Sequence, residues 1–262
     1  MFKTLDKKIF ATLLLAGLLG VAAGMPYMAD MLAVAGAGPI ATADVPLPLV
    51  VALVLVQNGL LLAVVIFLGM RLSGKVGLRM PLLQAWAEGG RTRSPVGLRA
   101  GLLAGAILGV VLVAVDALCF LQHVPAQMQS LFRVPLWKRL LAGVLYGGLT
   151  EELLMRLFVL SFLVWLVGRW WKQADGMPAP GAFWAAIGLV ALLFGLAHLP
   201  ATAAVVPLTP MLVLRALVLN GIGGVVFGFL YWRRGLEAAM LGHMAAHGVL
   251  QIPGFLLLNR ML

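Results

Sequence analysis

Three charged residues lie inside one long apolar stretch of this chain. The stretch 145–164 is long enough to span a bilayer and contains Glu151, Glu152 and Arg156 near its middle. A charged side chain at bilayer depth costs at least about 2.5–3.5 kcal/mol on insertion scales, so three charges together require a reason. This stretch is therefore the first place to look for chemistry.

Helical spacing gives the three charges different positions. Glu152 and Arg156 are four residues apart, so they share a helix face and can form an ion pair. Glu151 is five residues from Arg156 and points elsewhere, which leaves its carboxylate free. Two interpretations follow: a buried ion cluster that only fixes helix packing, or a site in which the free carboxylate acts as a base.

Three of the four histidines lie in or at the ends of later apolar segments. Phe194 and His198 share one face of a predicted helix, and His243 and His247 are four residues apart on another. A base that activates a water, with donors aimed at the developing oxyanion, could hydrolyse a peptide bond. Glu151 and these three histidines could instead hold zinc with one position open for water.

The spacing of the last two histidines favours the first alternative. The segment His243-Met-Ala-Ala-His247 lacks the glutamate that follows the first histidine in soluble zinc proteases. We therefore favour a metal-free glutamate mechanism without a cofactor and keep zinc as the alternative. The single cysteine, Cys119, excludes an internal disulfide and any site with several cysteine ligands.

The composition predicts an all-α, polytopic membrane helix bundle. Of 262 residues, 63% are hydrophobic and 11% are charged, whereas a soluble domain carries about 25% charged residues. The net charge of +10 could suggest a nucleic-acid partner in a soluble protein. Here the basic residues lie in loops between apolar runs, so they indicate topology within a lipid bilayer instead of nucleic-acid binding.

Seven apolar segments are expected to cross the bilayer, and an eighth short one could lie within 26–45. The seven are about 9–25, 50–70, 100–120, 145–168, 182–198, 211–232 and 236–258. The loop 71–99 carries six basic residues against one acid, which places this loop and the N-terminus in the cytoplasm. A tight turn at 233–235 is expected to separate the last two spans.

Several local expectations accompany these spans. Residues 28–45 have too short an uncharged run to cross and should form an external loop or interfacial segment. Pro200 should end the helix before it. Asp116 should lie at a wetted rim, and residues 134–139, with Arg139, at headgroup level. Residues 1–135 are taken as N-terminal spans with a basic loop, and 136–262 as the catalytic core.

Helical rise tests whether the site residues can meet. At about 1.5 Å per residue, Glu151 and His198 lie at matching height, roughly 25 and 24 Å from the cytoplasmic ends of their helices. His243 lies only about 12 Å, and His247 about 18 Å, from the turn at Arg234. Tilt or unequal protrusion of the helices must absorb this mismatch.

The three motifs together resemble the CAAX-protease and bacteriocin-processing (Abi) family of intramembrane endopeptidases. They are Glu-Glu-x-x-x-Arg at 151–156, Phe-x-x-x-His at 194–198 and a later histidine at 243, after LEAAML. The resemblance covers about residues 140–252. It implies cleavage of a peptide or membrane-anchored protein, with prenylated CAAX-type peptides among the candidate substrates.

The resemblance also implies roles for individual residues. Glu151 and His198 would activate the water, and His243 and His247 would stabilise the oxyanion. His247 stands where the family commonly has asparagine; an imidazole can donate a hydrogen bond, but it can also ligate a metal or titrate. Structural support is expected from Glu152, Arg156 and Phe194.

Two non-proteolytic alternatives use the same buried residues. A proton-coupled transporter could use the Glu and His side chains, but the paired repeats with broken helices that are common in transporters are not visible in the sequence. A family member without protease activity could serve as a membrane scaffold or immunity factor. This last alternative stays open, because complete motifs show capacity and not use.

Overall fold

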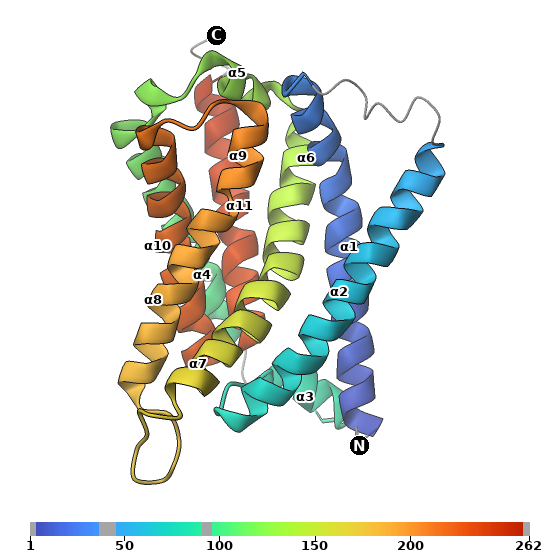
Figure 1. The fold of residues 1–262 in the computed structure, drawn as a ribbon, viewed down its shortest axis with the longest axis vertical. Coiled ribbons are helices and arrows are strands. Elements are labelled where there is room, and N and C mark those ends of the chain that lie inside the picture. Colours follow the sequence, from blue (N-terminus) through green and yellow to red (C-terminus); the bar gives the residue numbers. More distant parts are fainter. Residues whose placement is uncertain (1–3, 37–45, 91–95, 259–262) are drawn as a thin grey trace.

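The computed structural model describes residues 4–36, 46–90 and 96–258, and these residues form a helical bundle without strands (Figure 1). The all-α prediction is confirmed. The first half contains α1 (Thr4–Val34), α2 (Leu47–Lys75), α3 (Pro81–Ala87), α4 (Val96–Cys119), η1 (Leu121–His123), α5 (Ala126–Gln129) and η2 (Ser130–Arg133). The second half contains α6 (Leu136–Leu140), η3 (Leu141–Glu151), η4 (Leu153–Leu160), α7 (Ser161–Val167), α8 (Pro180–Ala197), α9 (Leu199–Val205), α10 (Pro210–Arg234) and α11 (Leu236–Leu258).

Five helices among the described residues are long and apolar enough to cross a membrane. They are Asp6–Val34, Leu47–Lys75, Gly97–Cys119, Pro180–Val205 and Pro210–Arg234. The two other expected spans correspond to the helical stretch 136–167 and to α11, which also run along the bundle (Figure 1). The number of spans, seven or eight, stays a prediction.

Proline and glycine set the helix ends that bring α8, α10 and α11 into place. Pro180 and Pro210 each lie in the first turn of a helix, where a missing N–H leaves no backbone partner unsatisfied. The Thr209 side chain accepts a hydrogen bond from the Leu212 N–H at 3.3 Å and caps α10. Gly235, with φ 101°, ends α10, and α11 starts at the next residue, which confirms the predicted turn.

The expected external segment 28–45 is wrong in its first part, because α1 continues past Pro26 to Val34. Tertiary contacts offset the helix hydrogen bond lost at this proline. Asp30 pairs with Lys138 at 2.7 Å, and Met31 packs in a small hydrophobic cluster with residues of α9 and α10. An eighth short span was considered within 26–45; of this region, residues 37–45 lie outside the described residues.

Two further local expectations concern Pro200 and Arg139. The helix before Pro200 ends at Ala197, as expected, and Pro200 itself lies in the first turn of a separate short helix, α9. Arg139, expected at headgroup level, is buried inside the protein. It is 4% exposed, and its guanidinium donates to Gln251 Oε1 at 2.9 Å and to the Phe132 carbonyl at 2.8 Å.

Asp116 was expected at a wetted rim, but it is largely buried in a bidentate ion pair. Its carboxylate accepts from Arg215 Nε at 2.7 Å and Nη2 at 2.6 Å, and both side chains are 19% exposed. The pair joins α4 to α10. The expected basic loop 71–99 includes the short helix α3, whereas residues 91–95 lie outside the described part of the chain.

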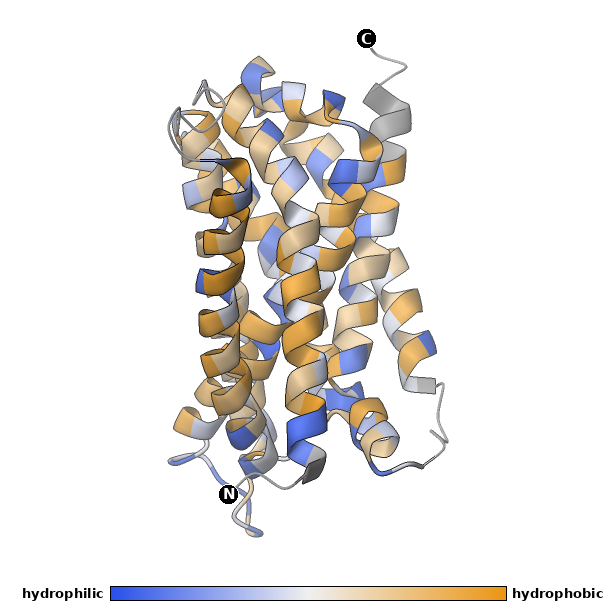
Figure 2. Cartoon of the chain, turned by 90° about the vertical axis from the view of Figure 1, so that its right-hand side faces the viewer, coloured by the Kyte–Doolittle hydropathy of each residue, from blue (hydrophilic) through white to orange (hydrophobic). Residues whose placement is uncertain are grey.

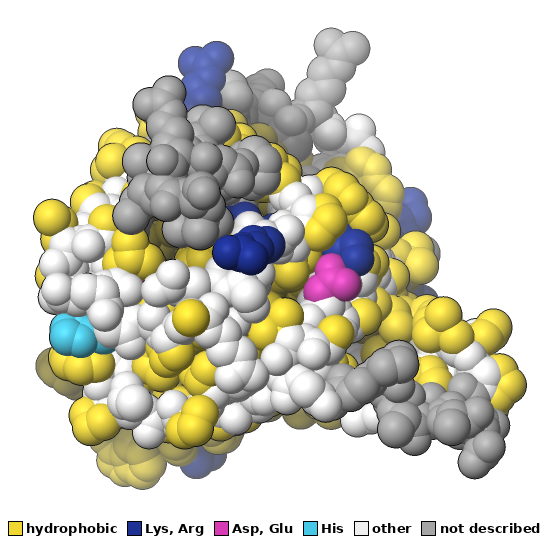
Figure 3. All heavy atoms as spheres, turned by 90° about the horizontal axis from the view of Figure 1, so that it is seen from above, with side chains coloured by type: hydrophobic (Ala, Val, Ile, Leu, Met, Phe, Trp, Pro, Cys, Tyr) yellow, Lys and Arg dark blue, Asp and Glu magenta, His cyan; other side chains and the backbone are white. Residues whose placement is uncertain are grey.

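The exterior of the bundle is apolar along its length. Figure 2 shows hydrophobic residues over most of the helical surface, with hydrophilic residues gathered towards the ends and at a few interior positions. Large side chains on α2, such as Leu53 and Leu60, are 58% and 68% exposed. Seen from above, charged side chains are sparse (Figure 3). Such a surface is suited to contact with lipid.

Close helix packing by glycine fixes the two helices that carry the candidate site. On α4, a Cβ at Gly101, Gly105 or Gly109 would meet backbone carbonyls of α11, so α11 lies directly on α4. On α1, a Cβ at Gly20 would meet the Leu145 carbonyl of η3 at 2.8 Å. The main core cluster joins α1 and α2 to η4, with Leu13, Leu62 and Leu153 among its members.

Candidate active site

The glutamate pair lies at a junction between two π-helical segments. Glu151 is the last residue of η3, and η4 begins at Leu153. Hydrogen bonds from i to i+5 are rare in helices and are frequently found at functional sites. Hydrophobic periodicity gave no sign of this geometry, because an apolar stretch of this length is equally compatible with an α-helix.

The predicted ion pair between Glu152 and Arg156 is present. Glu152 Oε1 lies 3.0 Å from Arg156 Nη1, and both side chains are fully buried. The guanidinium also lies over two aromatic rings, with its carbon 4.7 Å from the ring centre of Phe194 and 5.3 Å from that of Phe227. Glu152 and Arg156 therefore form the innermost, fully buried part of the site.

His243 connects this ion pair to Glu151. Its Nδ1 lies 2.8 Å from Glu152 Oε1, and its Nε2 lies 3.8 Å from Glu151 Oε2. The Phe227 ring stacks on the imidazole at 4.4 Å with an interplanar angle of 17°. Because a carboxylate accepts the hydrogen bond at Nδ1, Nε2 is the ring nitrogen left to face Glu151.

This contact removes the mismatch in depth expected from helical rise. Glu151 Oε2 and His243 Nε2 lie 3.8 Å apart, so the two side chains reach the same depth in the bundle although helical rise alone placed them apart.

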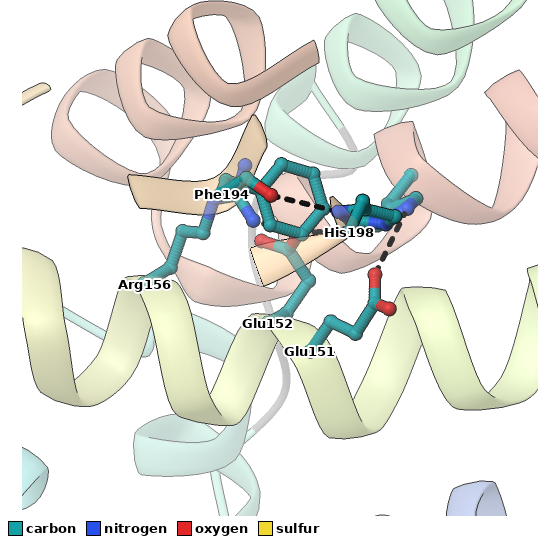
Figure 4. Close-up of polar contacts among 6 residues, drawn as sticks. Glu151, Glu152, Arg156, Phe194 and His198 are labelled. Carbon is teal, nitrogen blue, oxygen red and sulfur yellow. Dashed lines mark hydrogen bonds and ion pairs between the residues drawn. The ribbon is translucent and has the colours of Figure 1, made fainter. Parts of the chain in front are cut away.

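His198 is held by the backbone of its own helix. Its Nδ1 lies 2.7 Å from the Phe194 carbonyl, and the two rings meet edge to face at 4.8 Å. A carbonyl oxygen can only accept, so Nδ1 carries the hydrogen and Nε2 is free to act as a base. Figure 4 shows Glu151 and Glu152 projecting from one helix towards Phe194 and His198.

His247 completes the cluster by stacking on His243. The two imidazole centres are 5.1 Å apart, with an interplanar angle of 20°. A Cβ at Gly147 would lie 3.0 Å from Nε2 of His243 and 3.3 Å from Nε2 of His247. Both Nε2 atoms therefore face the same point beside η3, whereas a Cβ at Gly143 would meet the ring of His247.

Sequence reasoning missed Phe227 and the two glycines. Gly143 and Gly147 are four residues apart, the same spacing as His243 and His247 on the facing helix. This matched spacing was the signal that could have identified the glycines as the surface against which the imidazoles pack. Phe227 carries no such signal, because one phenylalanine in an apolar helix usually belongs to the core.

Among the described residues, no three His, Cys, Asp or Glu side chains are placed so that they could hold one metal ion. The arrangement instead offers a carboxylate, a neighbouring imidazole with a free Nε2, and two further Nε2 atoms that face one point. A water bound between the carboxylate and the imidazoles could lose a proton to them. The zinc alternative stays a prediction that metal analysis can test.

The segment 133–249 matches a family model described as type II CAAX prenyl endopeptidase Rce1-like. The match contains all three motifs, with Glu151, His198 and His243. Comparisons with curated proteins and with solved structures gave no match. The match covers less than half of the chain. Together with the five apolar helices, this similarity indicates an integral membrane protein. It also agrees with the resemblance to the CAAX-protease family that the three motifs suggested.

Proposed function

We propose that this protein is an intramembrane endopeptidase that hydrolyses a peptide bond with a water activated by Glu151 and His198. One observation carries the proposal. Glu152 forms the ion pair with Arg156 and accepts the hydrogen bond from His243. Glu151 Oε2, in contrast, lies 3.8 Å from His243 Nε2, which is beyond hydrogen-bond distance. The Glu151 side chain is also 19% exposed, so it can meet a water.

The proposed reaction uses each ring nitrogen in a defined way. Glu151, with His198 Nε2 beside it, takes a proton from the water while the water oxygen attacks the scissile carbonyl carbon. Nε2 of His243 and Nε2 of His247 face the developing oxyanion. His247 donates a hydrogen bond from Nε2–H, and His243, whose Nδ1–H is donated to Glu152, donates from Nε2 when the ring is protonated. The proton then passes to the leaving amine as the C–N bond breaks. No metal takes part in this proposal.

The proposed substrate is a membrane-associated peptide, with prenylated CAAX-type peptides as the first class to test. The matching family is described as prenyl endopeptidases, and the site lies between apolar helices. A peptide anchored by a hydrocarbon chain is concentrated at the bilayer, where the site is found. The N-terminus is proposed to be cytoplasmic, because the excess of basic residues in the loop 71–99 is typical of a cytoplasmic loop.

The test is cleavage of a fluorogenic peptide library by the purified protein in lipid nanodiscs. Half of the peptides carry a farnesylated cysteine near the C-terminus, and half are unprenylated. We expect Glu151→Gln to lower kcat/KM by about 10²-fold or more, the usual contribution of a general base. Glu88→Gln is the matched control, because Glu88 is an exposed residue at the end of α3. Absence of cleavage by the wild-type protein would favour the scaffold or immunity-factor alternative.

A further inference from the structure

Helix α1, which lies outside the segment that matches the family, contacts η3 next to the proposed base. The Thr150 hydroxyl donates a hydrogen bond to the Gly17 carbonyl of α1 at 2.8 Å, and Thr150 is 2% exposed. Thr150 directly precedes Glu151 in the chain. The last turn of η3 is therefore tied to α1 on one side and carries Glu151 towards the histidines on the other.

The hydrogen bond of Thr150 leaves its own helix, which is unusual. A threonine inside a helix commonly bonds the carbonyl four residues before it. Thr12 on α1 does this, because its hydroxyl donates to the Lys8 carbonyl at 3.0 Å. Thr150 instead uses its hydroxyl across the helix interface, where polar side chains join neighbouring helices in membranes.

Three glycines of α1 allow this contact. A Cβ at Gly17 would lie 2.9 Å from Leu153, and a Cβ at Gly20 would meet the Thr150 hydroxyl itself. A Cβ at Gly24 would lie 3.3 Å from Tyr146 one turn earlier in η3. Gly17, Gly20 and Gly24 form the glycine face of α1, and η3 and the start of η4 lie against it from Tyr146 to Leu153.

We propose that Thr150 and the glycine face of α1 are positioning elements that hold the Glu151 carboxylate at its working distance from the histidines. Thr150 acts through the backbone of η3 and touches no substrate. The proposal rests on the proposed role of Glu151 as the base. It assigns to the N-terminal part of the chain a direct part in catalytic geometry, in addition to spanning the membrane.

The physical reason is the sensitivity of proton transfer to position. η3 is π-helical up to Glu151, and the backbone hydrogen bonds of a π-helix have competing α-helical arrangements. A change from one arrangement to the other would rotate Glu151 about the helix axis. A misplacement of about 1 Å at a reacting group can lower a rate by about 10²-fold.

The experiment compares Thr150→Val, Thr150→Ser and Thr12→Val on the library peptide that the wild-type protein cleaves fastest. Valine keeps the shape of threonine but removes the hydroxyl, and serine restores it. We expect Thr150→Val to lower kcat by about 10- to 100-fold with KM within twofold, because geometry and not binding is lost. Thr150→Ser should recover most of kcat, and Thr12→Val should match the wild type.

A purely structural role for Thr150 gives a different result. It would lower the melting temperature of Thr150→Val but leave kcat per folded protein at the wild-type value, and this outcome overturns the proposal. Equal loss of kcat in Thr150→Ser also overturns it. Gly20→Ala is a second probe of the same contact, with Gly59→Ala as control, since a Cβ at Gly59 meets only Leu18, at an ordinary 3.5 Å.

Glu151→Gln, measured in parallel, separates this proposal from the proposed function. If Glu151→Gln is inactive and Thr150→Val keeps the wild-type kcat, the positioning role is wrong and the base assignment stands. If Glu151→Gln keeps its activity, the base assignment is wrong, and the positioning role is overturned with it.

Discussion

Ion pairs occur in two regions of this bundle, and they differ in how the acids and bases match. Away from the two adjacent glutamates, Asp116 pairs with Arg215 and Asp30 pairs with Lys138, each acid with one base. The side chains of these pairs are between 19% and 32% exposed. We refer to Asp116 and Arg215 as the α4–α10 pair.

The central cluster, made of Glu151, Glu152, Arg156 and His243, contains two acids beside one arginine. Glu152 meets both Arg156 and His243, and these three side chains are at most 4% exposed. Glu151 is left as a surplus acid against the imidazoles. A matched pair joins helices, whereas an acid without its own base among apolar helices is a charge with no structural need, which points to function.

The largest effect should follow from removing the imidazole at the open side of the central cluster. We expect His198→Ala to lower kcat/KM by about 10²–10⁴-fold while the protein stays folded, because Nε2 of His198 assists the base. His123→Ala is the control, since His123 lies in η1, far along the chain from the motifs. Peptide cleavage measures activity, and thermal unfolding in nanodiscs measures stability. Activity above about a tenth of wild type would remove His198 from the mechanism.

The two regions should also differ in stability. Glu152→Ala leaves Arg156 buried without its carboxylate and should destabilise the protein by about 3–5 kcal/mol. Asp116→Ala breaks the partly exposed α4–α10 pair and should cost about 1 kcal/mol. Unfolding by heat or denaturant compares the two variants.

A double variant tests whether the central pair is the cause of that loss. Glu152→Gln combined with Arg156→Met removes both charges and should recover stability relative to Glu152→Ala. If the double variant is no more stable than the worse of its single variants, the pair does not contribute in the way we describe.

His247 should have an intermediate effect that also separates the two mechanisms. His247→Ala should lose about 2.7–4 kcal/mol of transition-state stabilisation, the usual effect of one oxyanion donor. His247→Asn should keep most activity, because an amide N–H can replace the imidazole donor. Zinc that binds in stoichiometric amount, and is lost together with activity in His247→Asn, would show that the histidines ligate a metal instead.

The smallest effect should come from filling the space that both Nε2 atoms face. Gly147→Ala places a methyl group 3.0 Å from Nε2 of His243, so the imidazoles must shift by a few tenths of an ångström. We expect a loss of about tenfold in kcat, the effect of roughly 1.4 kcal/mol on the barrier. Gly188→Ala is the control, because a Cβ there has no neighbour within 4 Å among the described residues. Equal activity of the two variants would show that this space is not used.

Spacing within one helix was sufficient to predict several features of this molecule. The ion pair of Glu152 with Arg156 is present, and α11 has the bounds 236–258 that were expected. Each of these features depends on local periodicity or on a turn such as the one at Gly235.

Contacts between distant segments were not predictable in the same way. The hydrophobic pattern predicted that the first helix ends near Pro26. The helix continues to Val34, where Asp30 and Met31 contact residues more than 100 positions away in the chain. Arg139 looked interfacial because it follows Trp137, but it is buried against Gln251. The π-helical turn at Glu151 and the link from Thr150 to Gly17 also depend on tertiary packing.

The most direct test of the central claim exchanges the two adjacent glutamates for glutamine, one at a time. Activity on the peptide library and melting temperature are measured for each variant. We predict that Glu151→Gln keeps the wild-type melting temperature and loses at least about 10²-fold in kcat/KM, because only the base is removed. Glu152→Gln should lower the melting temperature. If Glu151→Gln keeps more than about a tenth of the activity, Glu151 is not the base and the account is wrong.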